Sequence, residues 1–262
     1  MSRIRVTMGR LRGQWIETRP GLPYRPLPAR LREAFFSHVG SDIEGHHFLD
    51  GFAGTGLVGV YALSLGAAYV IFIEKDVRAA RLLERNLRRL GLADQTDLRV
   101  GDIQRVLTRP PAVPVDWVFL GPPYDFPTAR LESVLSRLVQ SGWTGADARL
   151  AIQRFKKTPP PSTAGWELYG TLTHGDDVIY LFRRMAGKSD RSADGRMGRT
   201  ATSDGRPELR KSAPIELSVL QVCFRPGVEA STGCRVKPYR PEILLNFQTS
   251  ERPDCPERYR LP

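Results

Sequence analysis

Three acidic residues and a glycine-rich loop are spaced along the chain as a nucleoside-binding site would require. Asp50 ends an apolar run and is followed by the loop Gly51-Phe52-Ala53-Gly54-Thr55-Gly56. Glu74 closes the next β-rich run, and Asp102 follows the run after it. In a doubly wound sheet the carboxyl ends of parallel strands meet at one edge, where such acids bind a nucleoside. We therefore expect Glu74 to accept hydrogen bonds from a ribose and Asp102 to reach an adenine amino group.

The loop after Asp50 favours one class of nucleoside cofactor over another. Small residues let the backbone approach a ligand, and the helix expected next offers free N–H groups. The loop lacks the G-x-G-x-x-G spacing of NAD-binding proteins. Its D-x-F-A-G-[ST]-G pattern resembles that of S-adenosylmethionine-dependent methyltransferases. This resemblance implies that Asp50 holds the amino-acid end of the cofactor and that the backbone of Ala53, Gly54, Thr55 and Gly56 passes beneath it.

The tetrapeptide Gly121-Pro122-Pro123-Tyr124 follows the apolar run at 115–120. It resembles a signature of enzymes that methylate exocyclic amino groups, which usually begins with Asp or Asn. That side-chain oxygen and a Pro carbonyl hold the amino hydrogens, while the aromatic ring stacks on a flipped base. Gly121 lacks the side-chain oxygen, a loss worth on the order of 100- to 1,000-fold in rate by analogy with an oxyanion-hole donor. We expect Gly121→Asp to raise the rate, with Asp125 or water as candidate substitutes in the natural chain.

The elements that must position these residues alternate between β-rich and helical patterns, which is typical of an open α/β sheet. The expected strands cover 47–50, 69–74, 97–100, 117–120, 150–154, 166–172 and 178–183, the last two as an antiparallel pair at one edge. The expected helices cover 27–39, 57–65, 77–90 and 128–140, where apolar residues recur every three or four positions.

Positive charge is concentrated at the two ends of the chain. Residues 1–32 hold eight Arg and one acid, whereas residues 33–186 hold 17 basic and 17 acidic residues. Residues 187–262 hold 14 basic and 10 acidic residues, and the whole chain has a net charge of +11. A basic arm beside a neutral body is typical of a protein that binds phosphate backbones, although a solvated basic tail has the same composition.

Composition also divides the chain and narrows its class. We expect a basic arm and helix at 1–44, a catalytic core at 45–186, and a disordered Arg/Pro/Ser-rich tail at 187–262. No metal site is expected, because Cys223, Cys234 and Cys255 lack zinc-ligand spacing. No apolar run is long enough to span a membrane, and the N-terminus lacks the apolar middle of a signal peptide. We expect a cytoplasmic monomer.

Longer motifs identify a specific resemblance that covers residues 3–185. The chain resembles the RsmD family, bacterial methyltransferases that modify guanine N2 in 16S ribosomal RNA. The family's Gly/Arg-rich opening is similar to 8–13, its R-P-T-x-x-R-[VL]-R-E-[AT]-L-F segment to 25–36, and its cofactor loop and following helix to 50–67. The resemblance implies a Rossmann-like methyltransferase with a mostly parallel seven-stranded sheet, helices on both faces and S-adenosylmethionine as the cofactor.

The same resemblance implies the substrate and the roles of individual residues. The partner would be 16S rRNA or a small-subunit assembly particle. The residues expected to line the cofactor site are Asp50, Phe52, Ala53, Gly54, Thr55, Gly56, Glu74 and Asp102. The arginines expected near the RNA or the active-site entrance are Arg10, Arg12, Arg25, Arg30 and Arg32.

Three departures from the family pattern leave other functions open. Gly121 replaces the Asp of D-P-P-[YF], Leu27 and Ala29 replace Thr and Asp in the arginine-rich segment, and the tail has no family counterpart. Besides guanine-N2 methylation, the residues are compatible with methylation of adenine N6 in DNA. They are also compatible with a catalytically weakened or inactive homologue that binds RNA and S-adenosylmethionine.

Overall fold

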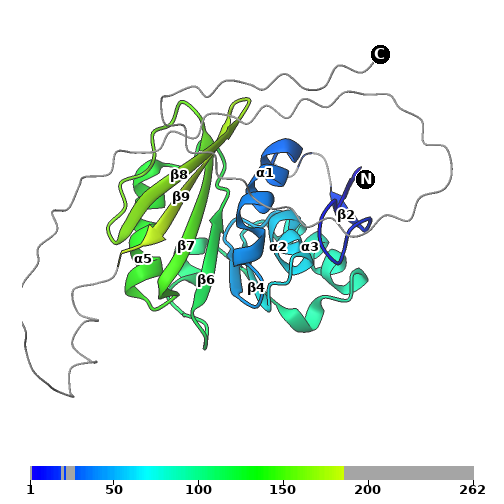
Figure 1. The fold of residues 1–262 in the computed structure, drawn as a ribbon. Helices are drawn as coiled ribbons and strands as arrows, with labels where there is room; N and C mark the ends of the chain where they lie inside the picture. Colours follow the sequence, from blue (N-terminus) through cyan, green and yellow to red (C-terminus); the bar gives the residue numbers. More distant parts are fainter. Residues whose placement is uncertain (1, 19–20, 22–26, 186–262) are drawn as a thin grey trace, which may run out of the picture. The chain divides into compact units, whose positions relative to one another are not determined.

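The central feature of the fold is a seven-stranded sheet in the order β5-β4-β3-β6-β7-β9-β8 (Figure 1). The computed structural model describes residues 2–18, 21 and 27–185. Arg25, the three cysteines and the expected tail at 187–262 therefore lie outside the described residues. The strands from β5 to β7 run parallel, whereas β9 runs antiparallel to both β7 and β8. This arrangement confirms the expected fold class.

The strands lie close to the positions expected from the sequence. Their bounds are β3 (His47–Asp50), β4 (Tyr69–Glu74), β5 (Thr96–Val100), β6 (Val115–Leu120), β7 (Thr144–Phe155), β8 (Trp166–His174) and β9 (Asp177–Arg184). Strand β7 begins six residues before the expected strand, and its register with β6 shifts between Val115 and Trp117. The exposed residues in this first part break the apolar pattern, which explains why the sequence did not reveal it.

Side chains of the strands alternate between two hydrophobic clusters, one on each face of the sheet. Phe48, Phe72 and Phe119 belong to the cluster that includes residues of α1 (Ala29–Val39), α2 (Leu57–Ser64) and α3 (Val77–Arg89). Their neighbours Leu49 and Leu120 belong to the cluster that includes residues of α4 (Ile103–Val106) and α5 (Thr128–Gln140). Helices therefore cover both faces, because each strand is apolar on both sides.

The residues before α3 and α1 explain where these two helices begin. Helix α3 begins after Asp76, whose Oδ1 accepts hydrogen bonds from the backbone N–H groups of Arg78 and Ala79. Helix α1 begins at Ala29 instead of Leu27, because Pro28 has an extended ψ of 141° and forms the N-cap. The four-residue helix α4 and the short 3-10 turns η1 (Gly40–Asp42) and η2 (Ala93–Gln95) were not expected from the sequence.

The basic N-terminal segment contains a hairpin that docks on the helices. Strands β1 (Ser2–Arg5) and β2 (Trp15–Thr18) are antiparallel. The Asn86 side chain of α3 exchanges two hydrogen bonds of 3.0 Å with the backbone of Glu17. Gly9 has φ +71° and passes so close to Ser64 that an added Cβ would lie 2.0 Å from its carbonyl oxygen. The segment is thus packed against the core, while the domain boundaries expected from composition stay predictions.

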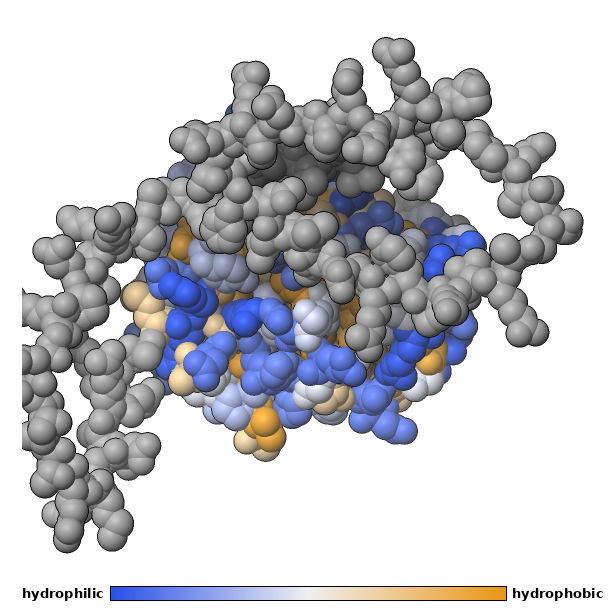
Figure 2. All heavy atoms as spheres, in the orientation of Figure 1, coloured by the Kyte–Doolittle hydropathy of each residue, from blue (hydrophilic) through white to orange (hydrophobic). Residues whose placement is uncertain are grey.

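Figure 2 shows one face of the molecule. Where grey atoms do not cover it, this face is largely hydrophilic, with hydrophobic side chains scattered over it. Among residues 2–18, 21 and 27–185, no helix is long and apolar enough to cross a membrane.

The close approach of α2 to the sheet leads to a prediction about stability. A Cβ on Gly59 would lie 2.2 Å from Cε1 of Phe72, so Gly59→Ala is expected to lower the free energy of unfolding by about 1–3 kcal/mol through overpacking. Urea unfolding would measure this change. Gly145→Ala is the matched control, because no atom lies within 4 Å of its added Cβ. Equal stabilities of the two variants would contradict the packing argument.

Candidate active site

The candidate site lies where the strand order reverses, at the carboxyl ends of β3 and β6. Strands β3 and β6 are adjacent and parallel, and β3 is followed by α2 on one face while β6 leads to α5 on the other. Ligands of open α/β sheets bind in the crevice at such a switch point. Two cavities are found there, and both are lined by Phe52 and Gly121.

The larger cavity has a volume of about 400 Å³, within the range of about 300–1,000 Å³ that is common for small-molecule sites. Glu74, Asp76 and Asp102 contribute acidic groups to its wall, and Phe52 and Phe126 contribute an aromatic pair with ring centroids 5.1 Å apart. The remaining lining residues are Gly51, Ile73, Lys75, Gly101, Ile103, Gly121, Pro123 and Arg130. Apolar walls with a few acids suit a flat aromatic group joined to a polyhydroxylated one.

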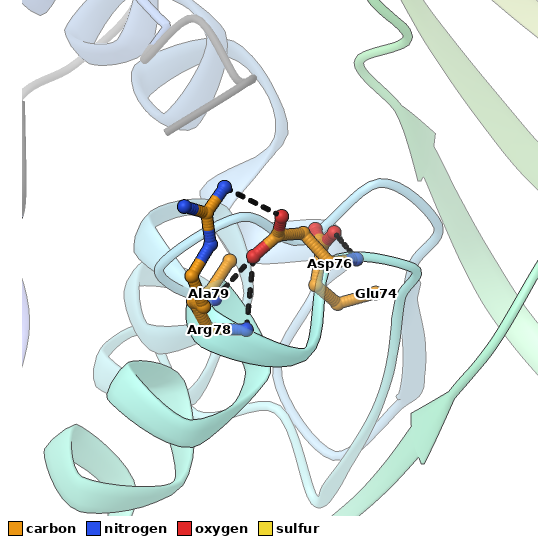
Figure 3. Close-up of polar contacts among 4 residues, drawn as sticks. All are labelled: Glu74, Asp76, Arg78 and Ala79. Atoms are coloured by element: carbon orange, nitrogen blue, oxygen red, sulfur yellow. Dashed lines mark hydrogen bonds and ion pairs between the residues drawn. The ribbon is translucent and has the colours of Figure 1, made fainter. Parts of the chain in front are cut away.

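Glu74 is held in place by two backbone groups. Its Oε2 accepts a hydrogen bond of 2.6 Å from the N–H of Gly54, and its Oε1 accepts one of 2.7 Å from the N–H of Asp76. Figure 3 shows Glu74 next to Asp76, which caps α3 and also accepts a hydrogen bond from the Arg78 guanidinium. Hydrogen bonds from Ala79 and Arg78 lower the pKa of Asp76. A carboxylate has about four lone-pair sites, so Glu74 retains acceptor capacity toward the cavity.

Asp102 has two partners in the structure. One oxygen caps α4 by accepting from the N–H of Gln104, and the other accepts a hydrogen bond of 3.1 Å from the Arg130 guanidinium. Arg130 also lies 5.1 Å from the centroid of the Phe126 ring. Asp102 lines the cavity, but its contact with an adenine stays a prediction. Phe126 and Arg130 were not expected from the sequence, because they belong to no motif and reach the cavity through contacts that only the fold creates.

Asp50 lines the smaller cavity and is 1% exposed. Its Oδ2 accepts a hydrogen bond of 2.9 Å from the N–H of Gly59, in the first turn of α2. Burial raises the pKa of Asp50 to about 7; the Gly59 hydrogen bond opposes this rise and the negative charge of Glu74 adds to it. Within the described part of the chain, no Lys or Arg side chain forms an ion pair with Asp50. The carboxylate is therefore a site that a positive group would stabilise.

The glycine-rich loop forms the remaining wall of the smaller cavity. Ala53, Gly54 and Thr55 line it together with Leu27, Leu57, Val58 and Phe119. Gly56 has φ +81° and directly precedes α2, and an added Cβ would lie 2.2 Å from Cδ1 of Leu83. The chain can turn here only because this residue has no side chain.

The tetrapeptide at 121–124 lies beside both cavities. Gly121 lines both, Pro122 is buried, and Pro123 lines the larger one. Tyr124 is 39% exposed, and its hydroxyl donates a hydrogen bond of 2.6 Å to Oδ1 of Asp177 at the start of β9. An exposed ring held by its hydroxyl is suited to stacking on a base, a role that stays a prediction.

The five arginines expected near RNA lie in different environments. Arg10, Arg12 and Arg30 are exposed, although the Arg10 side chain donates to the carbonyl of Leu63 and to Gln95. Arg32 is only 4% exposed, so it has no surface for contact with a phosphate backbone, and the expectation of direct RNA contact is corrected. Its guanidinium donates to the Leu27 carbonyl at 3.0 Å and lies 5.0 Å from the Tyr61 ring centroid. Arg32 therefore supports Leu27, a wall of the smaller cavity.

In the described part of the chain, no cluster of three or more His, Cys, Asp or Glu residues is arranged to hold a metal ion.

The buried carboxylate of Asp50 leads to a prediction about pH. Because its pKa is about 7 in the folded protein and 3.8 ordinarily, the folded state keeps a proton that the unfolded state loses as the pH rises from about 4 to 7. Stability therefore falls over that range. We expect Asp50→Asn to raise the free energy of unfolding at pH 8 by up to about 4 kcal/mol, at about 1.4 kcal/mol per pKa unit, and to change little near pH 4.

Denaturant unfolding at both pH values would measure this difference. Asp94→Asn is a suitable control, because Asp94 is exposed and its substitution removes no buried carboxylate. A gain of the same size at pH 4 and pH 8 would contradict the assignment of the effect to the buried charge.

Comparison with known proteins agrees with this geometry. A family model described as Conserved hypothetical protein 95 matches residues 4–183. The chain is 31% identical over 174 residues to Ribosomal RNA small subunit methyltransferase D of Haemophilus influenzae, covering 66% of this chain and 89% of that protein. It is 29% identical over 189 residues to the protein of the same name from Escherichia coli K12, covering 71% and 93%.

Solved structures show the same similarity. The Escherichia coli protein yhhF superimposes with a TM-score of 0.63 at 27% identity, covering 71% of this chain and 100% of that one. A Thermus thermophilus protein gives a TM-score of 0.57 at 30% identity, covering 68% and 98%. The matched region includes the two cavities, the strand-end acids and the tetrapeptide. This chain therefore belongs to the RsmD family and has the Rossmann-like fold of S-adenosylmethionine-dependent methyltransferases.

Proposed function

We propose that this protein transfers a methyl group from S-adenosylmethionine to N2 of a guanine in 16S ribosomal RNA. The position of Gly121 carries the proposal, because this residue lines both the larger cavity and the smaller one. S-adenosylmethionine has a nucleoside at one end, an amino acid at the other and the reactive sulfonium between them. A ligand whose nucleoside fills the larger cavity and whose other end reaches the smaller one, which has a volume of about 30 Å³, would place its middle beside the tetrapeptide.

The residues of the two cavities fit this cofactor. Glu74 keeps acceptor capacity for ribose hydroxyls, and the aromatic pair Phe52 and Phe126 suits an adenine. The buried Asp50 has a pKa of about 7 and no cationic partner in the described chain, so the cofactor's ammonium group would supply the missing positive charge. The Asp102 carboxylate would accept a hydrogen bond from the adenine amino group in addition to the one from the Arg130 guanidinium.

The chemistry requires the protein to align one nitrogen and to keep the base in place. When bound, S-adenosylmethionine supplies an electrophilic methyl group: the N2 lone pair forms the new N–C bond, the C–S bond pair returns to sulfur, and N2 releases a proton to water. The carbonyls of Gly121 and Pro122 would accept hydrogen bonds from the target amino group. Tyr124 would stack on the flipped base, and Asp177 fixes the ring through the tyrosine hydroxyl.

The substrate class is inferred from the relatives and from surface charge. The curated relatives are named small-subunit ribosomal RNA methyltransferases, and Arg10, Arg12 and Arg30 are exposed. These arginines would contact RNA phosphates. We further infer that the protein acts in the cytoplasm as a monomer on rRNA or on a small-subunit assembly particle.

Methyl transfer from labelled S-adenosylmethionine to small-subunit particles lacking the corresponding modification tests the proposal. We expect the label in N2-methylguanosine when the rRNA nucleosides are separated by mass spectrometry. Label in adenine of duplex DNA but not in rRNA would instead support a DNA adenine methyltransferase. Calorimetric binding of cofactor and RNA without any transfer would support a non-catalytic homologue, and both outcomes contradict the proposal.

The stacking role of Tyr124 gives a separate prediction. Tyr124→Ala is expected to lower the rate of methyl transfer about 10- to 100-fold, because stacking of one base is worth about 1–3 kcal/mol. Tyr124→Phe is the matched control, since it keeps the ring and removes the hydroxyl that donates to Asp177. Single-turnover rates at saturating cofactor would measure both. An equal loss in the two variants would show that the hydroxyl, not the ring, is what matters.

A further inference from the structure

Gln153 of β7 lies beside the glycine of the tetrapeptide. Strands β6 and β7 are parallel, with Leu120 paired to Ile152, so the next residues, Gly121 and Gln153, are neighbours at the carboxyl edge of the sheet. A Cβ added to Gly121 would lie 3.4 Å from Oε1 of Gln153. The amide oxygen of Gln153 therefore lies in the region where an Asp at position 121 would begin its side chain.

A hydrogen bond of the Gln153 NH₂ group sets the orientation of this amide. Nε2 of Gln153 donates a hydrogen bond of 3.0 Å to Oδ1 of Asp177, the same oxygen that accepts from the Tyr124 hydroxyl. A carboxylate accepts hydrogen bonds and does not donate them, so the NH₂ group must face Asp177 and the oxygen must face the other way. Gln153 is 6% exposed and Asp177 is 2% exposed, which restricts both side chains to this arrangement.

The amide oxygen has acceptor capacity that the protein itself does not use. Among residues 2–18, 21 and 27–185, no donor forms a hydrogen bond with Oε1 of Gln153. Gln153 lines the smaller cavity together with Asp50, Phe119 and Gly121. A polar oxygen at the wall of a cavity is favourable only when water or a ligand donates to it. We therefore expect a ligand or water in this cavity to donate a hydrogen bond to Oε1 of Gln153.

We propose that Oε1 of Gln153 accepts a hydrogen bond from the amino group of the target base and so replaces the side-chain acceptor that Gly121 lacks. This proposal rests on the proposed function. The amide is a neutral acceptor and not a base, so it aligns the nitrogen lone pair and the proton released from N2 goes to water. Asp177 then positions two parts of the base site together, namely the Tyr124 ring and the Gln153 amide.

The proposal also explains why position 121 has no side chain. An Asp there would place its Cβ 3.2 Å from Cε1 of Phe119 and 3.4 Å from Oε1 of Gln153, an oxygen whose partial charge has the same sign as the Asp carboxylate. We therefore expect an acceptor on β7 and an acceptor at position 121 to disfavour each other. This reverses the expectation from sequence that Gly121→Asp alone raises the rate.

Four variants and one control test the proposal in the methyl-transfer assay on small-subunit particles. Gln153→Met keeps the length of the side chain and removes the amide, and Gln140→Met makes the same change at an exposed position near the end of α5. Gly121→Asp, Gln153→Ala and the double variant Gly121→Asp/Gln153→Ala test the exchange of acceptors. For each protein kcat, KM for the particle, calorimetric affinity for S-adenosylhomocysteine and thermal unfolding are measured.

We expect Gln153→Met to lower kcat about 100-fold, as removal of one positioned hydrogen-bond partner does, with cofactor affinity and KM within about twofold of the natural protein. Gln140→Met is expected to behave as the natural protein. Gly121→Asp alone is expected to lower kcat. The double variant Gly121→Asp/Gln153→Ala is expected to have a kcat at least about tenfold higher than that of Gln153→Ala.

Other outcomes separate this inference from the proposed function. If the natural protein methylates N2 of guanine and Gln153→Met is as fast, the inference is wrong and the proposed function stands. If Gly121→Asp exceeds the natural protein, or if loss of cofactor binding accounts for the slower Gln153→Met, the inference is also wrong. Absence of any transfer by the natural protein contradicts the proposed function and, with it, an acceptor role for Gln153.

Discussion

The hydrogen bond between the Gly59 N–H and the buried carboxylate of Asp50 is the interaction on which the site depends. It joins the end of β3 to the first turn of α2, and the loop at 51–56 must close within that span. Gly59 can make this bond only because it lacks a side chain where α2 meets Phe72. The loop in turn presents the Gly54 N–H to Glu74. One short connection therefore positions Asp50 at the smaller cavity and Glu74 at the larger one.

The negative charge of the buried Asp50 carboxylate is electrostatically unfavourable in the protein without a ligand. A carboxylate that is 1% exposed and near Glu74 is held with a pKa of about 7, and the Gly59 hydrogen bond only partly offsets the cost of burial. Binding sites often keep such a charge because the ligand brings its counterion. The ammonium group proposed to bind there would turn a destabilising residue into a source of affinity.

The sequence predicted the sheet and singled out many of the residues that line the two cavities, because those features are local. Asp50, Glu74 and Asp102 each directly follow or end an apolar run, and the loop after Asp50 is a continuous motif. Gln153 and Asp177 gave no such signal, because their relation to Gly121 and Tyr124 exists only through strand pairing at β6, β7 and β9. Arg32 was misread for a related reason. Arg30 and Glu33 close to it in sequence are exposed, whereas Arg32 lies over the ring of Tyr61 in α2.

The proposed function requires one ligand to span both cavities with its reactive centre beside Gly121. A crystal structure of the protein with S-adenosylhomocysteine tests this most directly. We expect the ribose hydroxyls to contact Glu74, the ammonium group to contact Asp50, and the sulfur to lie next to Gly121. A ligand whose sulfur lies away from Gly121, or whose amino acid leaves Asp50 without a partner, would contradict it.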